Sequence, residues 1–162
     1  MTKKDYIQLL KDLNACGSAI EWSKNTKGGP QMLWNKCNRG DWMLWLISRI
    51  DPDRKRLVLT ACKCARLALK CVKKGDNRPL KAIETAEAWA NGTEGVSIQD
   101  VKDAAADAAA YAAYAANAAA YAADAADDAT RTETLKQCAD IVRGDWPKIS
   151  EVVGCQGKSA KE

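Results

Sequence analysis

The pattern of apolar and polar positions is most informative between residues 103 and 129, where the chain is alanine almost throughout. Polar side chains interrupt the alanines every three or four residues, at Asp103, Asp107, Tyr111, Tyr114, Asn117, Tyr121, Asp124 and Asp128. At about 100° per residue these positions fall within roughly 140° of one helical face, and the rest of the surface is methyl groups. Because alanine has the highest helix propensity, the stretch predicts a long helix. We expect its methyl face to pack closely against at least two other helices.

Helical spacing of apolar residues continues along the rest of the chain, and no segment alternates as a half-buried strand would. Each of the four prolines stands where a helix would begin, a position at which its missing N–H is not needed. The predicted helices cover residues 4–15, 17–25, 30–38, 41–50, 52–74, 79–90, 98–128, 130–143 and 147–153. The sequence therefore predicts an all-α fold, a compact multi-helix domain built around the long alanine-rich helix.

Chain length and helix length together set the expected domain organisation. The 162 residues suffice for one domain with a real core, which we expect over residues 1–153, with a disordered tail at 154–162. A single helix from 98 to 143 would be roughly 69 Å long, too long for a globule with a radius of gyration near 15 Å. Capping-box patterns begin at Ser97 and at Thr130. We therefore expect one helix to start after Ser97 and a break close to Thr130.

One tetrapeptide, Arg39-Gly40-Asp41-Trp42, recurs at residues 143–146. Its local interpretation is a helix junction in which glycine ends one helix, aspartate caps the next and tryptophan anchors the corner. Trp42, Trp45 and Trp89 lie in apolar surroundings, and we assign them to the core.

Composition narrows the function classes. The chain contains no histidine, which removes the commonest general base and the commonest neutral metal ligand and favours a protein that is not an enzyme. Cys62 and Cys64 would point about 160° apart on a helix, so they form a poor zinc pair. No cofactor and no metal site are expected. The seven scattered cysteines indicate a reduced, cytoplasmic protein, and the longest apolar run, 42–47, is far too short to span a membrane.

The net charge of +4 conceals an asymmetry between the two halves of the chain. Residues 1–81 carry 18 Lys/Arg against 7 Asp/Glu, whereas residues 82–162 carry 7 against 14. On the predicted helix 52–74, basic side chains gather within about 100° of arc, and this stripe is a candidate anion-binding site for phosphates, nucleic acid or an acidic protein. The alternatives are a solvated helix face and pairing with the aspartates of the alanine-rich helix. The candidate residues are Arg56, Lys63, Arg66, Lys70 and Lys73.

The tyrosines of the alanine-rich stretch form the second candidate surface. Tyrosine offers a large, fairly rigid contact area with a polar tip, which suits a surface that binds another protein. Burial of the same tyrosines in the space left by short alanine neighbours is the alternative. The candidate partner-binding residues are Tyr111, Tyr114, Tyr121, Asp107 and Asp124.

Several segments together resemble a family of alanine-rich bacterial and phage proteins labelled "putative immunity protein". The resemblance covers most of residues 10–150 and includes the alanine-rich stretch. It is carried by segments 39–46, 56–62, 64–66, 78–79, 82–90 and 138–143. It implies a cytosolic protein of a bacterial host that neutralises a toxin or host-defence effector by binding to it, and it brings no set of functional residues.

Three function classes remain in order of preference. The first is a non-catalytic inhibitory binder of a protein effector or toxin, either an immunity protein or a phage counter-defence protein. The second is a binder of nucleotides or nucleic acid through the basic helix face, and the third is a phage structural or assembly protein. Each of these function classes is compatible with a homo-oligomer, and we expect no membrane partner for any of them.

Overall fold

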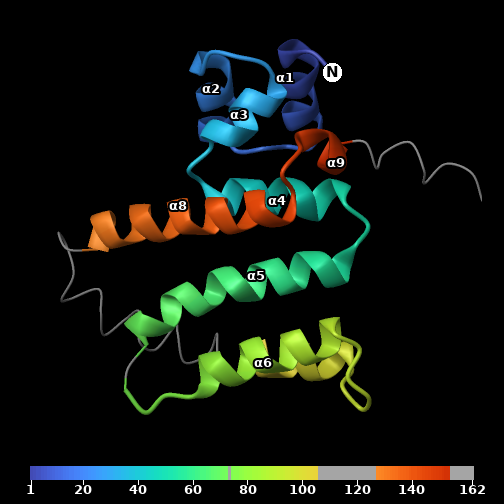
Figure 1. The fold of residues 1–162 in the computed structure, drawn as a ribbon, viewed down its shortest axis with the longest axis vertical. Coiled ribbons are helices and arrows are strands. Elements are labelled where there is room, and N and C mark those ends of the chain that lie inside the picture. The colour runs from blue at the N-terminus through green and yellow to red at the C-terminus, as the bar shows by residue number, and fades with distance from the viewer. Residues whose placement is uncertain (73, 106–126, 154–162) are drawn as a thin grey trace, which may run out of the picture. The chain divides into compact units, whose positions relative to one another are not determined.

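The computed structural model describes residues 1–72, 74–105 and 127–153, and every regular element in this part of the chain is helical (Figure 1). The predicted all-α class is confirmed. The alanine-rich stretch from 106 to 126 and the tail from 154 lie outside the described residues, and so do the expectations that concern them. Within the described ranges, no helix is long and apolar enough to cross a membrane.

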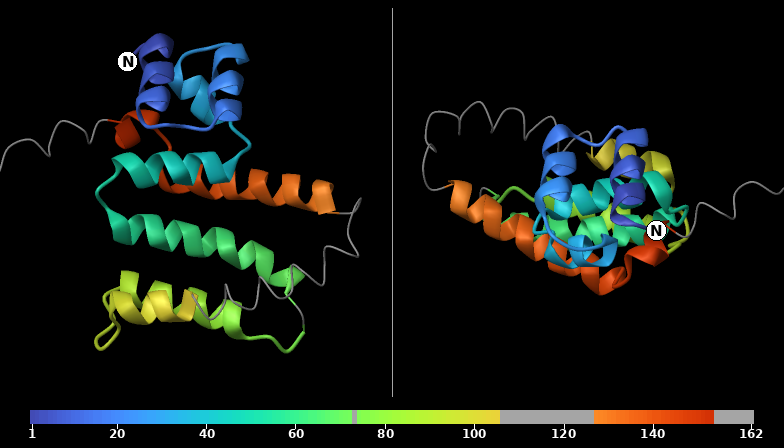
Figure 2. Two further views of the ribbon diagram at one scale, coloured as in Figure 1. Left: turned by 180° about the vertical axis from the view of Figure 1, so that it is seen from behind. Right: turned by 90° about the horizontal axis from the view of Figure 1, so that it is seen from above.

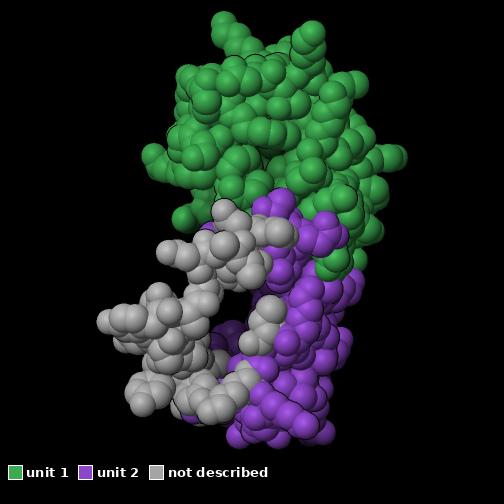
Figure 3. Space-filling view, turned by 90° about the vertical axis from the view of Figure 1, so that its left-hand side faces the viewer, with its two compact units in different colours: residues 1–52, 135–162 green, residues 53–134 purple. Residues whose placement is uncertain are grey.

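The chain divides into two compact units, which Figure 3 colours separately. Unit 1 comprises Met1–Pro52 and Leu135–Glu162, and unit 2 comprises Asp53–Thr134. The expectation of one domain over residues 1–153 stays a prediction, and each unit is described by itself below.

Unit 1 consists of short helices from both ends of the sequence. The first helix begins with a capping box, in which the Thr2 hydroxyl accepts the Asp5 N–H and the Asp5 carboxylate accepts the Thr2 N–H. The third helix begins at a proline, which suits the first position of a helix. In Figures 1 and 2, α4 (Gly40–Ile50) and the C-terminal part of α8 (Asp127–Asp145) run side by side. The elements are α1 (Lys3–Asp12), α2 (Gly17–Asn25), α3 (Pro30–Lys36), α4 (Gly40–Ile50), the end of α8 (Asp127–Asp145) and α9 (Ile149–Val153).

Two buried indoles join the N-terminal and C-terminal segments of unit 1. Trp34 Nε1–H donates to the backbone carbonyl of Trp146 at 2.8 Å, and Trp146 Nε1–H donates to Asp51 Oδ2, also at 2.8 Å. Trp34, Trp146 and Asp51 are only 2 %, 0 % and 6 % exposed. Because a buried polar group without a partner costs about 1–3 kcal/mol, these bonds are needed for the indoles to be buried at all. They fix the end of α8 and the start of α9 against α3 and the end of α4.

Arg143 strengthens the same junction from the last turn of α8. Its Nη1 donates to the backbone carbonyls of Cys37 at 2.6 Å and Trp34 at 3.4 Å, and its Nη2 donates to Asp140 at 2.6 Å. The last carbonyls of a helix have no partner within the helix and carry partial negative charge. The Arg143 guanidinium therefore caps the C-terminal end of α3.

The two copies of the repeated tetrapeptide have different roles. Arg39 is the N-cap of α4, so the first copy begins a helix, whereas Gly144 and Asp145 belong to the last turn of α8. The prediction that glycine ends a helix and aspartate caps the next is therefore wrong: Asp41 lies in the first turn of α4 and pairs with Arg39. Trp146 is fully buried, but Trp42 is only half-buried.

The tryptophans assigned to the core from the sequence are not the ones that form it. Trp42, Trp45 and Trp89 are half-buried, and the fully buried indoles are those of Trp34 and Trp146. Apolar neighbours along a helix show which face points inward, but not how completely other elements cover it.

Gly40 allows α4 to begin in direct contact with α8. A Cβ atom at this position would overlap Cys138 Cβ and would lie 2.7 Å from the backbone nitrogen of Ala139. Cys138 and Ala139 are themselves buried. Only a residue without a side chain leaves space for this approach, whereas a Cβ at Gly144 would meet nothing within 4 Å.

The helix start predicted at Thr130 is wrong, because residues 127–145 form one helix. The carbonyl of Thr130 accepts a hydrogen bond from the Thr134 hydroxyl at 2.8 Å within that helix. Thr130 thus contributes a backbone carbonyl to the interior of the helix, and the sequence pattern of a capping box does not by itself require a helix start. The box at Ser97 is confirmed: Ser97 and Asp100 exchange both bonds, and residues 98–105 are helical.

Unit 2 contains two antiparallel helices that pack on each other, α5 (Arg54–Ala68) and α6 (Arg78–Ala90). Asp53 caps α5 by accepting the Arg56 N–H at 3.0 Å. The helix predicted for 52–74 ends earlier, in a short 3-10 turn, η1 (Leu69–Cys71). Between the helices, Cys62 Sγ donates to the carbonyl of Ile83 at 3.7 Å.

We predict opposite effects of the same substitution at the two glycines of the repeat. Gly40→Ala places a methyl group against Cys138 and Ala139 and should lower the free energy of unfolding by about 1–3 kcal/mol. Gly144→Ala adds a methyl group in open space inside a helix and should raise it by up to about 1 kcal/mol. Urea unfolding followed by tryptophan fluorescence measures both. Equal effects at the two positions would contradict the close approach of α4 and α8.

Candidate functional site

The tyrosine and aspartate stripe predicted as the partner-binding surface lies outside the described residues. It comprises Tyr111, Tyr114, Tyr121, Asp107 and Asp124. The assignment stays a prediction from the sequence.

The basic helix face lies on α5 and η1, and its described members are Arg56, Lys63, Arg66 and Lys70; Lys73 is outside the described residues. Lys63, Arg66 and Lys70 are exposed, and Arg56 is half-buried. Five of the fifteen residues of α5 are Lys or Arg, and none is acidic. We call Arg56, Lys63, Arg66 and Lys70 the basic face. At about 100° per residue, these four residues lie roughly 40–120° around the helix from Cys62, the side chain that meets α6.

Arg66 is held in place by an acidic residue that the sequence analysis did not single out. Its Nε and Nη2 donate to the two carboxylate oxygens of Glu87 on α6, at 2.9 and 2.6 Å. The hydrogen bonds and charge of Arg66 lower the pKa of Glu87, and those of Glu87 raise the pKa of Arg66. The pairing fixes the guanidinium and removes one positive charge from the basic face. Glu87 occurs in a helix with an ordinary mixture of charges, so nothing local marks it as the partner.

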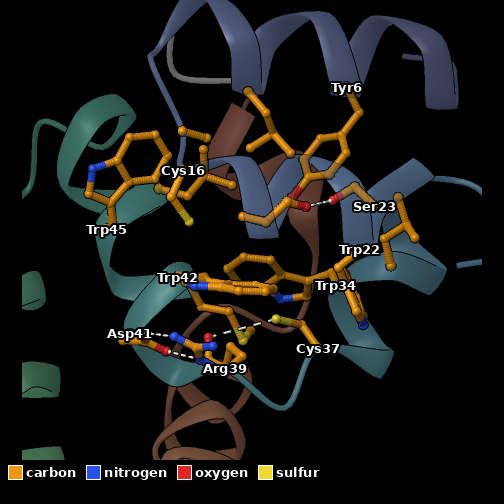
Figure 4. A pocket seen from close by; sticks show the side chains of 16 residues that line it. Tyr6, Cys16, Trp22, Ser23, Trp34, Cys37, Arg39, Asp41, Trp42 and Trp45 are labelled. Carbon is orange, nitrogen blue, oxygen red and sulfur yellow. Dashed lines mark hydrogen bonds and ion pairs between the residues drawn. The ribbon is translucent and has the colours of Figure 1, made fainter. Parts of the chain in front are cut away.

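Unit 1 contains a pocket that the sequence analysis missed. The cavity has a volume of about 380 Å3 and is lined by residues of α1, α2, α3 and α4 and of the turns between them (Figure 4). Small-molecule sites have volumes of roughly 300–1,000 Å3 and mostly apolar walls with a few polar groups. Because four helices each supply part of the wall, no single segment carries its signature. The aromatic side chains of the wall are Tyr6, Trp22, Trp34, Trp42 and Trp45.

A closed ion pair stands at the edge of this pocket. Arg39 Nε and Nη2 donate to the carboxylate oxygens of Asp41, at 2.9 and 2.6 Å (Figure 4). The Arg39 guanidinium also lies 4.3 Å from the centroid of the Trp42 ring, which meets the ring of Trp22 edge-on at 6.2 Å. Partial burial raises the pKa of Asp41, but the hydrogen bonds and charge of Arg39 outweigh it, so the net pKa is lowered. Both charges are therefore present at neutral pH and cancel locally.

The interior of the pocket is uncharged. Burial raises the pKa of the Tyr6 phenol far above its ordinary value and raises the pKa of the Cys37 thiol as well, so both keep their protons at neutral pH. Cys37 Sγ donates to the carbonyl of Arg39 at 3.7 Å, and Ser23 Oγ donates to the carbonyl of Ala19 at 2.8 Å. The groups present suit binding by shape and by hydrogen bonds. In the described ranges, no three Cys, Asp or Glu residues lie close enough together to hold a metal ion.

Comparison with known families decides the affiliation of the chain. A family model described as "Imm-5 like putative immunity protein" matches residues 50–140, more than half of the chain. The protein belongs to this family. The resemblance inferred from the sequence is thereby confirmed. No curated protein and no solved structure gives a significant match.

The region matched by the Imm-5 like family contains the basic face but not the aromatic pocket. Residues 50–140 include α5, α6, the basic face and the Arg66–Glu87 pair. All residues that line the aromatic pocket lie between Tyr6 and Leu46, ahead of the matched region. The family description therefore concerns unit 2 and part of α8, and the pocket needs its own explanation.

We predict that Tyr6 makes stability sensitive to alkaline pH. An ordinary tyrosine titrates at about pH 10. The raised pKa of Tyr6 means that the folded protein holds the phenol proton more tightly than the unfolded chain does. The resulting contribution to stability is complete below about pH 10 and is lost as the pH rises further. The free energy of unfolding should fall more steeply above pH 10 in the wild-type protein than in Tyr6→Phe, by up to about 1.4 kcal/mol per pH unit. Parallel pH profiles would show that the phenol is not buried.

Proposed function

We propose that this protein is a non-catalytic inhibitory binder that neutralises a toxin or host-defence effector in the cytoplasm, as an immunity protein or a phage counter-defence protein. The observation that carries the proposal is the family match over residues 50–140. The absence of histidine from the chain supports inhibition by binding rather than by catalysis, because it removes the residue most used for proton transfer at neutral pH.

The basic face is the described surface best suited to meet the effector within the matched region. Its helix rests on α6 through Cys62 and Ile83 and through Arg66 and Glu87, so the charges stand on a fixed support. Lys63 and Lys70 are exposed near the paired Arg66. Such an arrangement favours an effector with an acidic surface, because complementary charge accelerates encounter and selects the orientation of docking. The predicted tyrosine and aspartate stripe is a second proposed surface, suited to a basic effector, and it rests on the sequence alone.

Binding of nucleotides or nucleic acid is the second candidate function, and the acid-free composition of α5 favours it. Against it stands the bidentate Arg66–Glu87 pair, since a carboxylate within the stripe repels phosphates and occupies the donor best shaped for them. The salt dependence separates the two candidates. Nucleic-acid binding should weaken with a steep, sequence-independent slope that falls when Lys63 and Lys70 are neutralised.

The test of the proposed function begins with effectors encoded next to the gene. Each is co-expressed with the protein, and growth and the isolated effector's activity are measured with and without it. The proposal predicts restored growth, a stable complex and an effector that is chemically unchanged. A protein that binds no such effector, or that covalently alters one, is not an inhibitory binder.

We predict that charge reversal on the basic face weakens the complex through the association rate. The double variant Lys63→Glu/Lys70→Glu should lower the rate at low salt by about tenfold or more, and added salt should shrink the difference. The matched control is Lys81→Glu/Lys102→Glu, which makes the same charge change at two exposed residues of unit 2 that do not belong to α5 or to the basic face. Surface plasmon resonance measures both. Equal rates for the two double variants would exclude the basic face as the docking surface.

A further inference from the structure

The aromatic pocket of unit 1 has the features of a built binding site, and the proposed function makes no use of it. Its wall combines residues from α1, α2, α3 and α4, and the indole of Trp34 at its base is locked by the bond to Trp146. A loose gap between helices would close by side-chain rearrangement, since protein interiors are densely packed. Here the bulky rings of Trp22, Trp34 and Trp42 are held by one another or by hydrogen bonds.

The hydroxyl of Tyr6 is the polar group that points to a ligand. The side chain is only 7 % exposed and its ring extends into the cavity (Figure 4). None of the hydrogen bonds in the described part of the chain involves this hydroxyl, although the nearby Ser23 and Cys37 groups both have backbone acceptors. No fully buried side-chain oxygen or nitrogen of the described residues lacks a hydrogen-bond partner, so the Tyr6 hydroxyl itself is open to the cavity that its ring lines. A solvent molecule or a ligand inside the cavity therefore supplies its hydrogen-bond partner. A protonated phenol presents a donor there.

The charges around the pocket restrict the chemistry of that partner. Arg39 and Asp41 are paired with each other at the edge, and Arg39 is stacked on Trp42. A charged ligand would have to enter an apolar interior without a counter-ion, at a cost of several kcal/mol. A flat, uncharged ring would instead contact the faces and edges of the surrounding aromatic side chains.

We propose that this pocket binds an uncharged aromatic small molecule that accepts a hydrogen bond from the Tyr6 hydroxyl. The volume of about 380 Å3 accommodates a compound of two or three fused rings, within the usual range of small-molecule sites. Trp22 and Trp42 flank the ring system, and Tyr6 fixes its orientation. The site lies entirely within residues 6–46, outside the region that the family model matches.

Fluorescence of an environment-sensitive probe tests this proposal on the full-length protein. The probe is 6-propionyl-2-dimethylaminonaphthalene, an uncharged two-ring compound with a ketone acceptor. We expect saturable one-to-one binding, a blue shift of its emission and energy transfer from tryptophan. The anionic probe 8-anilinonaphthalene-1-sulfonate should bind at least about tenfold more weakly, because its sulfonate has no counter-ion in the pocket. No blue shift, or equal affinity for the two probes, would overturn the proposal.

Two variants test whether the probe binds in this pocket. Tyr6→Phe removes only the hydroxyl and should weaken the ketone probe about three- to tenfold, while binding of 2-dimethylaminonaphthalene, which lacks the ketone, stays unchanged. Ala15→Leu narrows the pocket and should weaken both compounds. Its matched control is Ala82→Leu, at a half-buried alanine of α6 that does not line the pocket. Thermal melting shows whether each variant is folded.

The outcomes separate this proposal from the proposed function. Wild-type affinity of folded Tyr6→Phe for the ketone probe would exclude the Tyr6 hydrogen bond. If Tyr6→Phe does not fold, Ala15→Leu decides, and equal affinities of Ala15→Leu and Ala82→Leu would exclude the pocket. Neither result bears on effector binding through unit 2, which is measured separately on the Lys63 and Lys70 variants.

Discussion

Unit 1 depends on two hydrogen bonds made by buried indoles, from Trp34 to the carbonyl of Trp146 and from Trp146 to Asp51. They join residues separated by 112 and 95 positions in the sequence. Loop closure over such distances costs entropy, and the indoles compensate for it by burying large apolar rings without leaving a polar group unsatisfied. Arg143 adds a charged cap on the end of α3 at the same place. The pocket adjoins this junction, because Trp34 also forms part of its wall.

Much of the fold could be predicted from the sequence, because local rules decide it. Proline positions and apolar spacing located α2, α3, α4 and α6 to within a few residues, and the capping box at Ser97 was confirmed. Thr130 shows the limit of these rules, since the same four-residue pattern lies inside α8, where the Thr130 carbonyl accepts a hydrogen bond from the Thr134 hydroxyl. The repeated tetrapeptide shows another: identical residues begin α4 and end α8, because neighbouring elements and not the four residues decide their role.

The candidate surfaces were predictable only in part, because local rules do not show which helices meet. The basic face follows from helical periodicity, so Lys63, Arg66 and Lys70 could be placed on one side of a helix in advance. Glu87 could not be identified as the partner of Arg66, and Tyr6 could not be placed in a cavity with Trp42, because both relationships require knowledge of which helices meet. The two surfaces also differ in chemistry. Unit 2 offers exposed charge, whereas the pocket of unit 1 has an aromatic wall and a closed Arg39–Asp41 ion pair at its edge.

Hydrogen exchange of the tryptophan indoles, followed by NMR on 15N-labelled protein, tests most directly whether the buried indole pair holds unit 1 together. Trp34 and Trp146 Nε1–H are hydrogen-bonded and at most 2 % exposed, so they should exchange only when the unit unfolds. The half-buried Trp22, Trp42 and Trp45 indoles should exchange far faster. Exchange of Trp34 or Trp146 as rapid as that of Trp42 would contradict this account of unit 1.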